Sequence, residues 1–312
     1  MMSVNQSVLG KAIAIVFVVF GHLGFIPNGG AIGVSLFLVL SGYGMAKSAK
    51  KNNYQLKDFW IKRIKGVYIP FLLCSLLTVC ILYVTRCIIN GDMEFYRIIL
   101  GILGFPNNPY DPTMWYISYI FMMYISFWCS FKFFNTECKK VIMCFVLCLI
   151  FGVVGIFVYK GSIGIYLYIV SFSIGVMTAI YEKKLKISGF FAQAYKFGLF
   201  VAFLIILEYL SARNVIFYIF LTTYISLFSI PILMHAPTIG NGLLFSIGQS
   251  SFAIYLVEGI IMKILWENIG DDKMLWNFVS GLCILCVGVL IHYCWKVIIS
   301  FKLPKRGNGN CR

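Results

Sequence analysis

The chain has 312 residues, of which 61% are apolar or aromatic and 12% are charged, and its formal net charge is +15. An ordinary soluble domain carries about 25% charged residues, so this composition excludes a soluble enzyme, a coiled coil, a disordered tail and a secreted disulfide scaffold. A membrane-spanning helix needs about 20 mainly apolar residues. The sequence therefore predicts an all-α polytopic membrane bundle of about ten segments.

Apolar runs, separated by polar residues, glycine or proline, place these segments along the chain. No convincing small-x-small cleavage site follows the first run, so we expect it to remain as a helix. The second run is short and flanked by glycine, which indicates a tilted or broken helix. No polar linker divides the chain, and residues 1–312 are expected to form a single integral membrane domain. The predicted segments cover about 8–25, 30–46, 66–89, 114–134, 140–158, 162–180, 190–210, 215–234, 243–265 and 274–300.

The basic residues are distributed unevenly between the two sides of the predicted bundle. With a cytoplasmic N-terminus, 19 Lys and Arg residues lie on the inner side and six on the outer side. Cytoplasmic loops collect Lys and Arg, so the count predicts a multi-pass protein of the cell membrane with both termini in the cytoplasm. Stacking aromatics do not alternate with the basic residues on a polar face, which argues against nucleic acid as a partner. The use of Ile, Lys and Asn is typical of a low-GC bacterium.

The 11 cysteines lie mostly in apolar runs, where they pack as small hydrophobic residues. Cys283 and Cys286 form a C-x-x-C pair, but no second pair and no histidine cluster accompanies them. We therefore expect no metal site and no disulfide framework.

Ionisable residues inside apolar runs are costly, and each is a candidate for function. The candidates are Lys11 at the edge of its run and His22, Lys196, Glu208, Glu258 and His292 within theirs.

Lys11 and His22 are the most informative pair among these candidates. Eleven helical residues make three full turns plus about 20°, so the two side chains share one face, about 16 Å apart along the axis. We expect Lys11 at the cytoplasmic surface and His22 near the middle of the hydrocarbon core. A cation there can hold a phosphate, and an imidazole at that depth can act as a general base. The alternative is a lysine that extends to the surface and a histidine bonded to a neighbouring backbone carbonyl.

Seven glycines lie between Gly21 and Gly44. Glycine in a spanning helix permits either close contact between helices or an unwound stretch that lines a cavity. The sequence leaves both interpretations open.

Several of these residues also match motifs of a known family. The Lys11-x10-His22 spacing resembles the (Arg/Lys)-x10-His signature in the first helix of the membrane acyltransferase-3 family. The run Phe37-x-x-x-Ser41-Gly42 is similar to that family's F-F-x-x-S-G element, with leucine at the second phenylalanine.

Later motifs extend the resemblance over the whole chain. The basic stretch with Lys62, Arg63 and Lys65 is similar to the family's R-x-x-R region before a proline, and the run 114–116 resembles its L-W-(F/Y) element. The run 250–256 resembles its late S-Y-x-I-Y-L element, which a histidine often follows. This chain has Glu258 there, as a substitute acid, a partner for His22 or a structural ion.

The resemblance implies transfer of an acyl group, most often acetyl from acetyl-CoA, to a sugar hydroxyl on the far side of the membrane. The acceptor would be a surface polysaccharide (capsular, exo- or lipopolysaccharide) or a lipid-linked sugar. His22 would act as a general base or a transient acyl carrier, and Glu258 joins it as the second catalytic candidate. The residues expected to bind acetyl-CoA are Lys11, Ser41, Gly42, Lys62, Arg63 and Lys65.

The predicted outer loop from about residue 90 to 113 and the helix start that follows it supply the candidates for acceptor binding. Asp111, Trp115 and Tyr116 offer a carboxylate and aromatic faces to a sugar, although a solvated loop and an interfacial aromatic belt would use the same residues. The rival functional class is a transporter or flippase for a lipid-linked sugar or an anionic solute, since transporters also combine broken helices with buried ionisable groups. No internal repeat supports that class.

Overall fold

The computed structural model describes residues 2–84, 95–105, 111–158, 168–182, 197, 200–201, 203–207, 209–210, 215–237, 240, 242–266 and 273–302. Within these ranges every regular element is a helix, and eight helices are long and apolar enough to cross a membrane. The predicted all-α polytopic bundle is thereby confirmed. The predicted segment at 162–180 is represented by a shorter apolar helix, and the segment at 190–210, with Lys196 and Glu208, falls largely outside the described residues.

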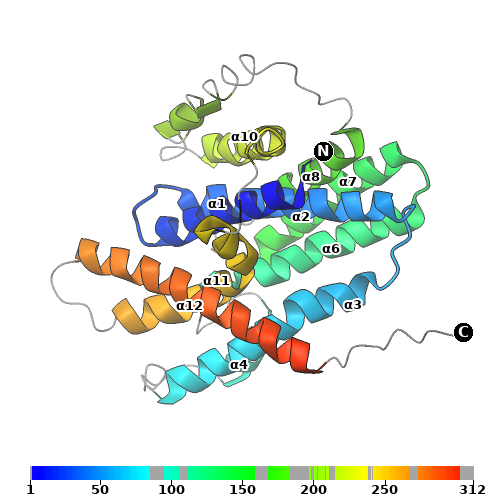
Figure 1. Ribbon diagram of the computed structural model, residues 1–312. Coiled ribbons are helices and arrows are strands. Elements are labelled where there is room, and N and C mark those ends of the chain that lie inside the picture. The colour runs from blue at the N-terminus through cyan, green and yellow to red at the C-terminus, as the bar shows by residue number, and fades with distance from the viewer. Residues whose placement is uncertain are drawn as a thin grey trace, which may run out of the picture.

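Figure 1 shows the helices of the bundle, labelled in chain order. Their bounds are α1 (Val4–His22), α2 (Gly29–Lys51), α3 (Phe59–Arg63), the π-helical turn η1 (Ile64–Tyr68), α4 (Ile69–Val84), α5 (Phe95–Ile102), the 3-10 turn η2 (Pro112–Met114), α6 (Trp115–Phe133), α7 (Glu137–Val158), α8 (Ser171–Tyr181), α10 (Val215–Leu233), α11 (Leu243–Trp266) and α12 (Lys273–Lys302).

Helix α1 is fixed at both ends by local sequence. Ser3 and Gln6 form a capping box, in which each side chain accepts a hydrogen bond from the backbone N–H of the other residue. At the other end, α1 stops at His22, and Gly24 adopts a φ of +82° in the turn that follows. His22 is therefore the last residue of the helix. The predicted first segment, about 8–25, therefore runs three residues too far, because the glycine turn ends α1 earlier than the apolar run does.

Helix α2 occupies the centre of the bundle and contacts α1, α8 and α10. It is continuous over 23 residues, so the break that its flanking glycines predicted is absent. The glycines instead bring backbones together. A Cβ atom at Gly42 would lie 2.1 Å from the carbonyl oxygen of Phe172, and one at Gly175 would lie 2.1 Å from that of Val39. Of the two interpretations of the glycines, close helix packing holds at these positions.

A second group of helices closes the other side of α1. Helix α11 packs against both α1 and α12. A Cβ at Gly248 of α11 would lie 2.1 Å from the carbonyl oxygen of Val8 in α1, so this contact also depends on glycine. Since α1 lies between α2 and α11, residues from these three helices can meet at the end of α1.

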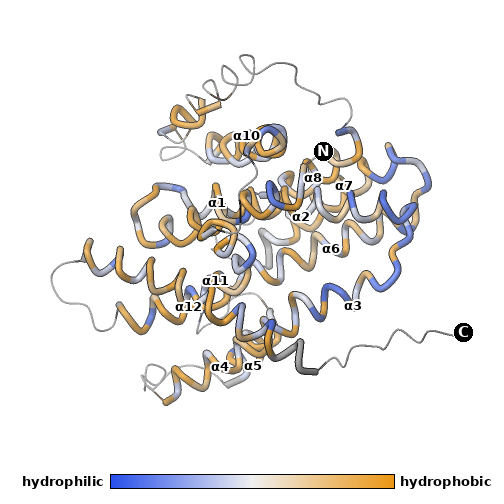
Figure 2. The backbone as a smooth tube through the Cα atoms, in the orientation of Figure 1, coloured by the Kyte–Doolittle hydropathy of each residue, from blue (hydrophilic) through white to orange (hydrophobic). Residues whose placement is uncertain are grey.

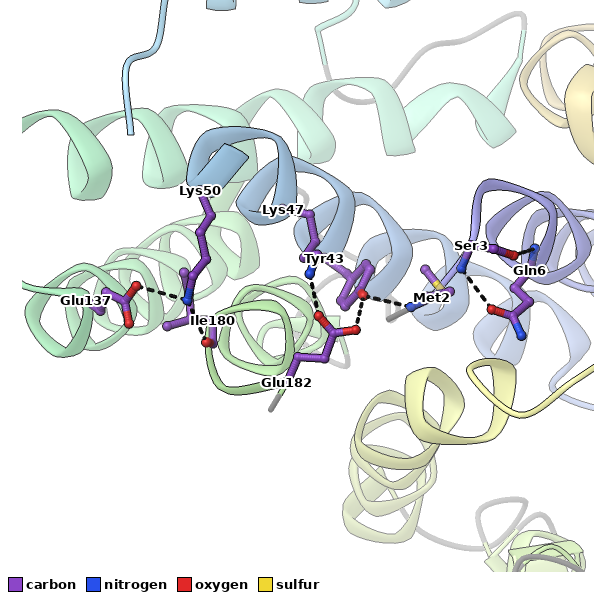
Figure 3. A network of polar contacts seen from close by, with 9 residues as sticks. All are labelled: Met2, Ser3, Gln6, Tyr43, Lys47, Lys50, Glu137, Ile180 and Glu182. Carbon is purple, nitrogen blue, oxygen red and sulfur yellow. Dashed lines mark hydrogen bonds and ion pairs between the residues drawn. The ribbon is translucent and has the colours of Figure 1, made fainter. Parts of the chain in front are cut away.

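Hydrophilic residues gather at one end of the bundle, around the turn between α2 and α3 and the start of α7 (Figure 2). Figure 3 shows the polar contacts there. Lys47 and Tyr43 of α2 both donate to the carboxylate of Glu182, and Lys50 lies 3.0 Å from that of Glu137. Burial raises the pKa of Glu182, but the bonds from Lys47 and Tyr43 outweigh it and hold the pKa below its usual value. These contacts tie α2 to α7 and α8.

Candidate active site

A cavity of about 700 Å³ lies between α1, α2, η1, α6, α10 and α11. It follows the length of α1, because both Lys11 and His22 line it, as the shared helix face requires. Its wall combines small residues of α1 and α2 with aromatic residues of α6, α10 and α11. The lining residues that carry polar groups are Ser7, Lys11, His22, Asn28, Ser41, Arg63, Thr113, Trp115, Tyr116, Tyr124, Tyr168, Tyr218, Ser251 and Tyr255.

His22 is joined to Glu258 at one end of the cavity. The Nδ1 atom of His22 lies 2.8 Å from Oε1 of Glu258, whose side chain is fully buried on α11, whereas the His22 side chain is 37% exposed. Of the three roles open for Glu258, its position corresponds to the partner of His22. A carboxylate that accepts from Nδ1–H fixes the tautomer in which Nε2 carries the lone pair. That nitrogen is then the one available to a reactant.

Gly30 borders the free edge of this imidazole. A Cβ atom at Gly30 would lie 3.3 Å from Nε2 of His22, and both residues line the cavity. The missing side chain therefore leaves space at the nitrogen that Glu258 does not occupy.

Two cations line the cavity away from His22. Lys11 projects from α1, and the guanidinium of Arg63 lies over the rings of Phe59 and Tyr124, with Cζ 5.3 and 5.2 Å from their centroids. The two cations are close enough to interact electrostatically. Within the described ranges, no carboxylate forms an ion pair with either. Stacking on aromatic rings holds the Arg63 guanidinium in place while leaving its charge available to an anion.

The other residues expected to bind acetyl-CoA are divided by the structure. Ser41 lines the cavity. Lys62 and Lys65 are exposed and do not line it, and Gly42 is in contact with the backbone of α8. Thus Lys11, Ser41 and Arg63 are brought together, whereas Lys62, Lys65 and Gly42 are not.

The three residues expected to bind the acceptor are also separated. Trp115 and Tyr116 line the cavity, with Trp115 stacked on Tyr168 at 5.8 Å between centroids and Tyr116 edge-on to Tyr255 at 5.7 Å. Asp111 is 1% exposed and is not part of the lining. It caps η2, where Oδ1 accepts from N and Oγ1 of Thr113 at 3.0 and 2.6 Å.

Sequence reasoning missed several aromatic residues of the cavity wall, among them Tyr124, Tyr168, Tyr218, Phe252 and Tyr255. Phe252 and Tyr255 belong to the late motif at 250–256, so that motif was a signal for them. Tyr168 and Tyr218 carry no motif, because their place in the wall results from the packing of α8 and α10 against α2.

The other histidines lie elsewhere. His292, the remaining described candidate, does not line the cavity. His235, which was not a candidate, does not line it either, and its Nδ1 donates to the carbonyl oxygen of Pro231 at 2.8 Å. Among the described residues no group of three His, Cys, Asp or Glu side chains is arranged to hold a metal ion.

A family model described as an acyltransferase domain matches residues 8–294. The match includes the motifs that contribute Lys11, His22, Arg63 and Glu258 to the site. Neither the curated proteins nor the solved structures yield a match. The chain belongs to the acyltransferase-3 family and is a membrane acyltransferase.

Proposed function

We propose that the chain transfers an acetyl group from cytoplasmic acetyl-CoA to a hydroxyl of a cell-surface sugar, with His22 as the general base. One observation carries the proposal: a single cavity joins two cations, Lys11 and Arg63, to an imidazole held by Glu258. Family membership supports acyl transfer, and the two ends of the cavity supply the distinct chemistry that a donor and an acceptor need.

The cation end suits the phosphates of coenzyme A. Lys11 provides a compact ammonium, and Arg63 provides a planar guanidinium able to bind a phosphate through two donors. Eleven helical residues separate Lys11 from His22, or about 16 Å along the axis, a distance comparable to an extended pantetheine arm. A donor with its phosphates at Lys11 and Arg63 would therefore bring its thioester close to His22.

The proposed reaction follows from the tautomer of His22. Nε2 removes the proton of an acceptor hydroxyl while the hydroxyl oxygen attacks the thioester carbonyl carbon. The C–S bond then breaks, and the coenzyme A thiolate takes the proton from the imidazolium. Glu258 stabilises the imidazolium between the two steps and holds the ring in orientation. Donor and acceptor thus exchange one acyl group and one proton, and His22 returns to its starting state.

The acceptor side of the cavity is rich in aromatic residues. Trp115 and Tyr116 lie at the start of α6, and Phe252 and Tyr255 of α11 line the same space. Aromatic faces and phenolic hydroxyls suit the ring faces and hydroxyls of a sugar. This arrangement supports a surface polysaccharide or lipid-linked sugar as the acceptor.

The proposal is tested by label transfer from radioactive acetyl-CoA in membranes that contain the wild type or His22→Ala. We expect label in surface glycan with the wild type and its loss with the variant. His235→Ala is the matched control, because His235 follows the end of α10, bonds to the carbonyl oxygen of Pro231 in that helix and does not line the cavity. A second measurement follows heat denaturation of the purified protein with and without acetyl-CoA. Absence of both transfer and acetyl-CoA protection would contradict the proposal and favour a transporter.

A further inference from the structure

Asp111 is a buried carboxylate beside the catalytic pair. It is 1% exposed and absent from the cavity lining, so it does not offer a free surface to an acceptor. Its carboxylate is packed against α11: a Cβ atom at Gly259 would lie 2.2 Å from Oδ1 and 2.3 Å from Oδ2 of Asp111. Gly259 directly follows Glu258. Because residue 259 has no side chain, the carboxylate of Asp111 can approach the backbone of α11 directly beside Glu258.

The segment that carries Asp111 is fastened to the same part of α11. Tyr255 donates from its hydroxyl to the carbonyl oxygen of Thr113 at 2.7 Å, and Thr113 donates to Asp111. Tyr255 and Glu258 lie three residues apart, on one face of the helix. The contacts at Tyr255 and Gly259 therefore fix the position of Asp111 relative to Glu258.

Among the described residues, titratable groups on three helices interact electrostatically with Asp111. They are His22 at the end of α1, Glu258 and Tyr255 on α11, and Cys74 on α4. His22 is the one among these that becomes positively charged. The charge of Asp111 acts favourably on His22 and unfavourably on Glu258.

We propose that Asp111 is a positioning residue that stabilises the imidazolium of His22 through its negative charge. It does so without touching a substrate, alongside the hydrogen bond that Nδ1 of His22 donates to Glu258. The inference rests on the proposed function in one respect, namely that His22 takes up a proton during transfer. Two carboxylates then face one imidazolium, so that a net negative charge surrounds the position where positive charge forms.

The alternative is that Asp111 merely caps η2. Asn and Ser also cap helices, and neither carries a charge. Asp111→Asn also keeps an oxygen that can accept the two hydrogen bonds from Thr113. Loss of the cap and loss of the charge can therefore be separated. The charge of Asp111 also changes with pH. Burial raises the pKa of Asp111 to about 6, although the hydrogen bonds from Thr113 lower it in part.

The first test measures the state of His22 directly, without acyl transfer. The chain has three histidines, so His235 and His292 are replaced by Asn in the purified full-length protein. The rate at which diethyl pyrocarbonate modifies His22 is then followed against pH, since only the neutral imidazole reacts. We expect Asp111→Asn to move the midpoint of this curve to lower pH by about 0.5 to 1 unit, because a negative charge beside the ring is lost. Asp111→Ser should do the same.

Glu182→Gln is the matched control, because it also removes a buried carboxylate but lies at the other end of α2. Its midpoint should equal that of the reference protein. An unchanged midpoint in both Asp111 variants would overturn the proposal. So would an equal shift in Glu182→Gln, since the effect would then not be local.

The second test uses acetyl transfer. Because Asp111→Asn imitates the protonated side chain, its kcat should approach that of the wild type below pH 6 and fall behind it about tenfold above pH 6. The KM for acetyl-CoA should not change. A loss of kcat that is independent of pH would not follow the charge of Asp111 and would contradict the proposal. If the wild type transfers no acetyl group, the proposed function fails, while the modification curve still decides the role of Asp111.

Discussion

The Nε2 atom of His22 and the backbone of Gly30 face each other across the turn between α1 and α2, with 3.3 Å between that nitrogen and the position of a Cβ atom at residue 30. Glu258 holds the opposite nitrogen of the ring at 2.8 Å. The imidazole is thus fixed on one edge by a carboxylate and left accessible on the other by a missing side chain. In the proposed mechanism, the reaction takes place in the volume beside Gly30.

Filling that volume should slow catalysis without unfolding the protein. In Gly30→Ala the new methyl group meets only His22 within 4 Å, so we expect a folded protein whose kcat is about ten- to a hundredfold lower. The loss should increase from acetyl to larger acyl donors. Gly44→Ala is the control, because Gly44 also lines the cavity and a Cβ there meets nothing within 4 Å. Equal rates for the two variants would count against this assignment.

The donor site can be tested with neighbouring basic residues. Arg63 lines the cavity, whereas Lys62 is exposed outside it. Arg63→Ala should raise the KM for acetyl-CoA about ten- to a hundredfold, since it removes charge-assisted hydrogen bonds to phosphate. Lys62→Ala should leave KM near the wild-type value. A similar rise in KM in both variants would show that acetyl-CoA is attracted by the basic surface in general and not by the cation that lines the cavity.

Glu258 is expected to act through His22. Glu258→Gln keeps the shape of the side chain but loses the negative charge that stabilises the imidazolium. We expect kcat to fall by about 10² to 10⁴, with little change in the KM for acetyl-CoA. Steady-state transfer at saturating acceptor measures both quantities. A large rise in KM with an unchanged kcat would instead place Glu258 in donor binding.

The polar contacts at the other end of α2 should make stability depend on pH. Because the pKa of Glu182 is held below its unfolded value of about 4.3, its contribution is present above that pH and is lost as pH falls through the folded pKa. Glu182→Gln should lower the free energy of unfolding by about 2 kcal/mol at neutral pH and by less in acid. Thermal unfolding in detergent at pH 7 and pH 3 measures the difference. A loss that is equal at both values would exclude the ion pair as its cause.

Local sequence was sufficient to predict most of the helices and the part of the site that α1 contributes. Apolar runs located the long helices, and the period of the α-helix placed Lys11 and His22 on one face. The end of α1 was misjudged because Leu23 and Phe25 continue the apolar run beyond the glycine turn. The pattern of apolar residues does not predict the positive φ at Gly24, in the turn that ends the helix.

The rest of the site depends on contacts between segments distant in the sequence. His22 and Glu258 are 236 residues apart, and their pairing results from the packing of α11 against α1. Asp111 was expected to face an acceptor, but the contact with Gly259 buries it. Arg63 and Lys62 are adjacent and chemically similar, and only the docking of α3 and η1 decides which of them enters the cavity.

The termination of α1 at His22 has one more consequence. The last turn of a helix presents carbonyl groups whose dipoles sum to about half a negative charge, and a cation there is favoured by about 0.3 to 1 kcal/mol or more when partly buried. His22 occupies this position, so the peptide backbone itself favours the protonated ring. A variant that lacks both neighbouring carboxylates would still retain this contribution. The end of α1 at His22 is therefore expected to set the residual transfer activity of a variant that lacks both Glu258 and Asp111.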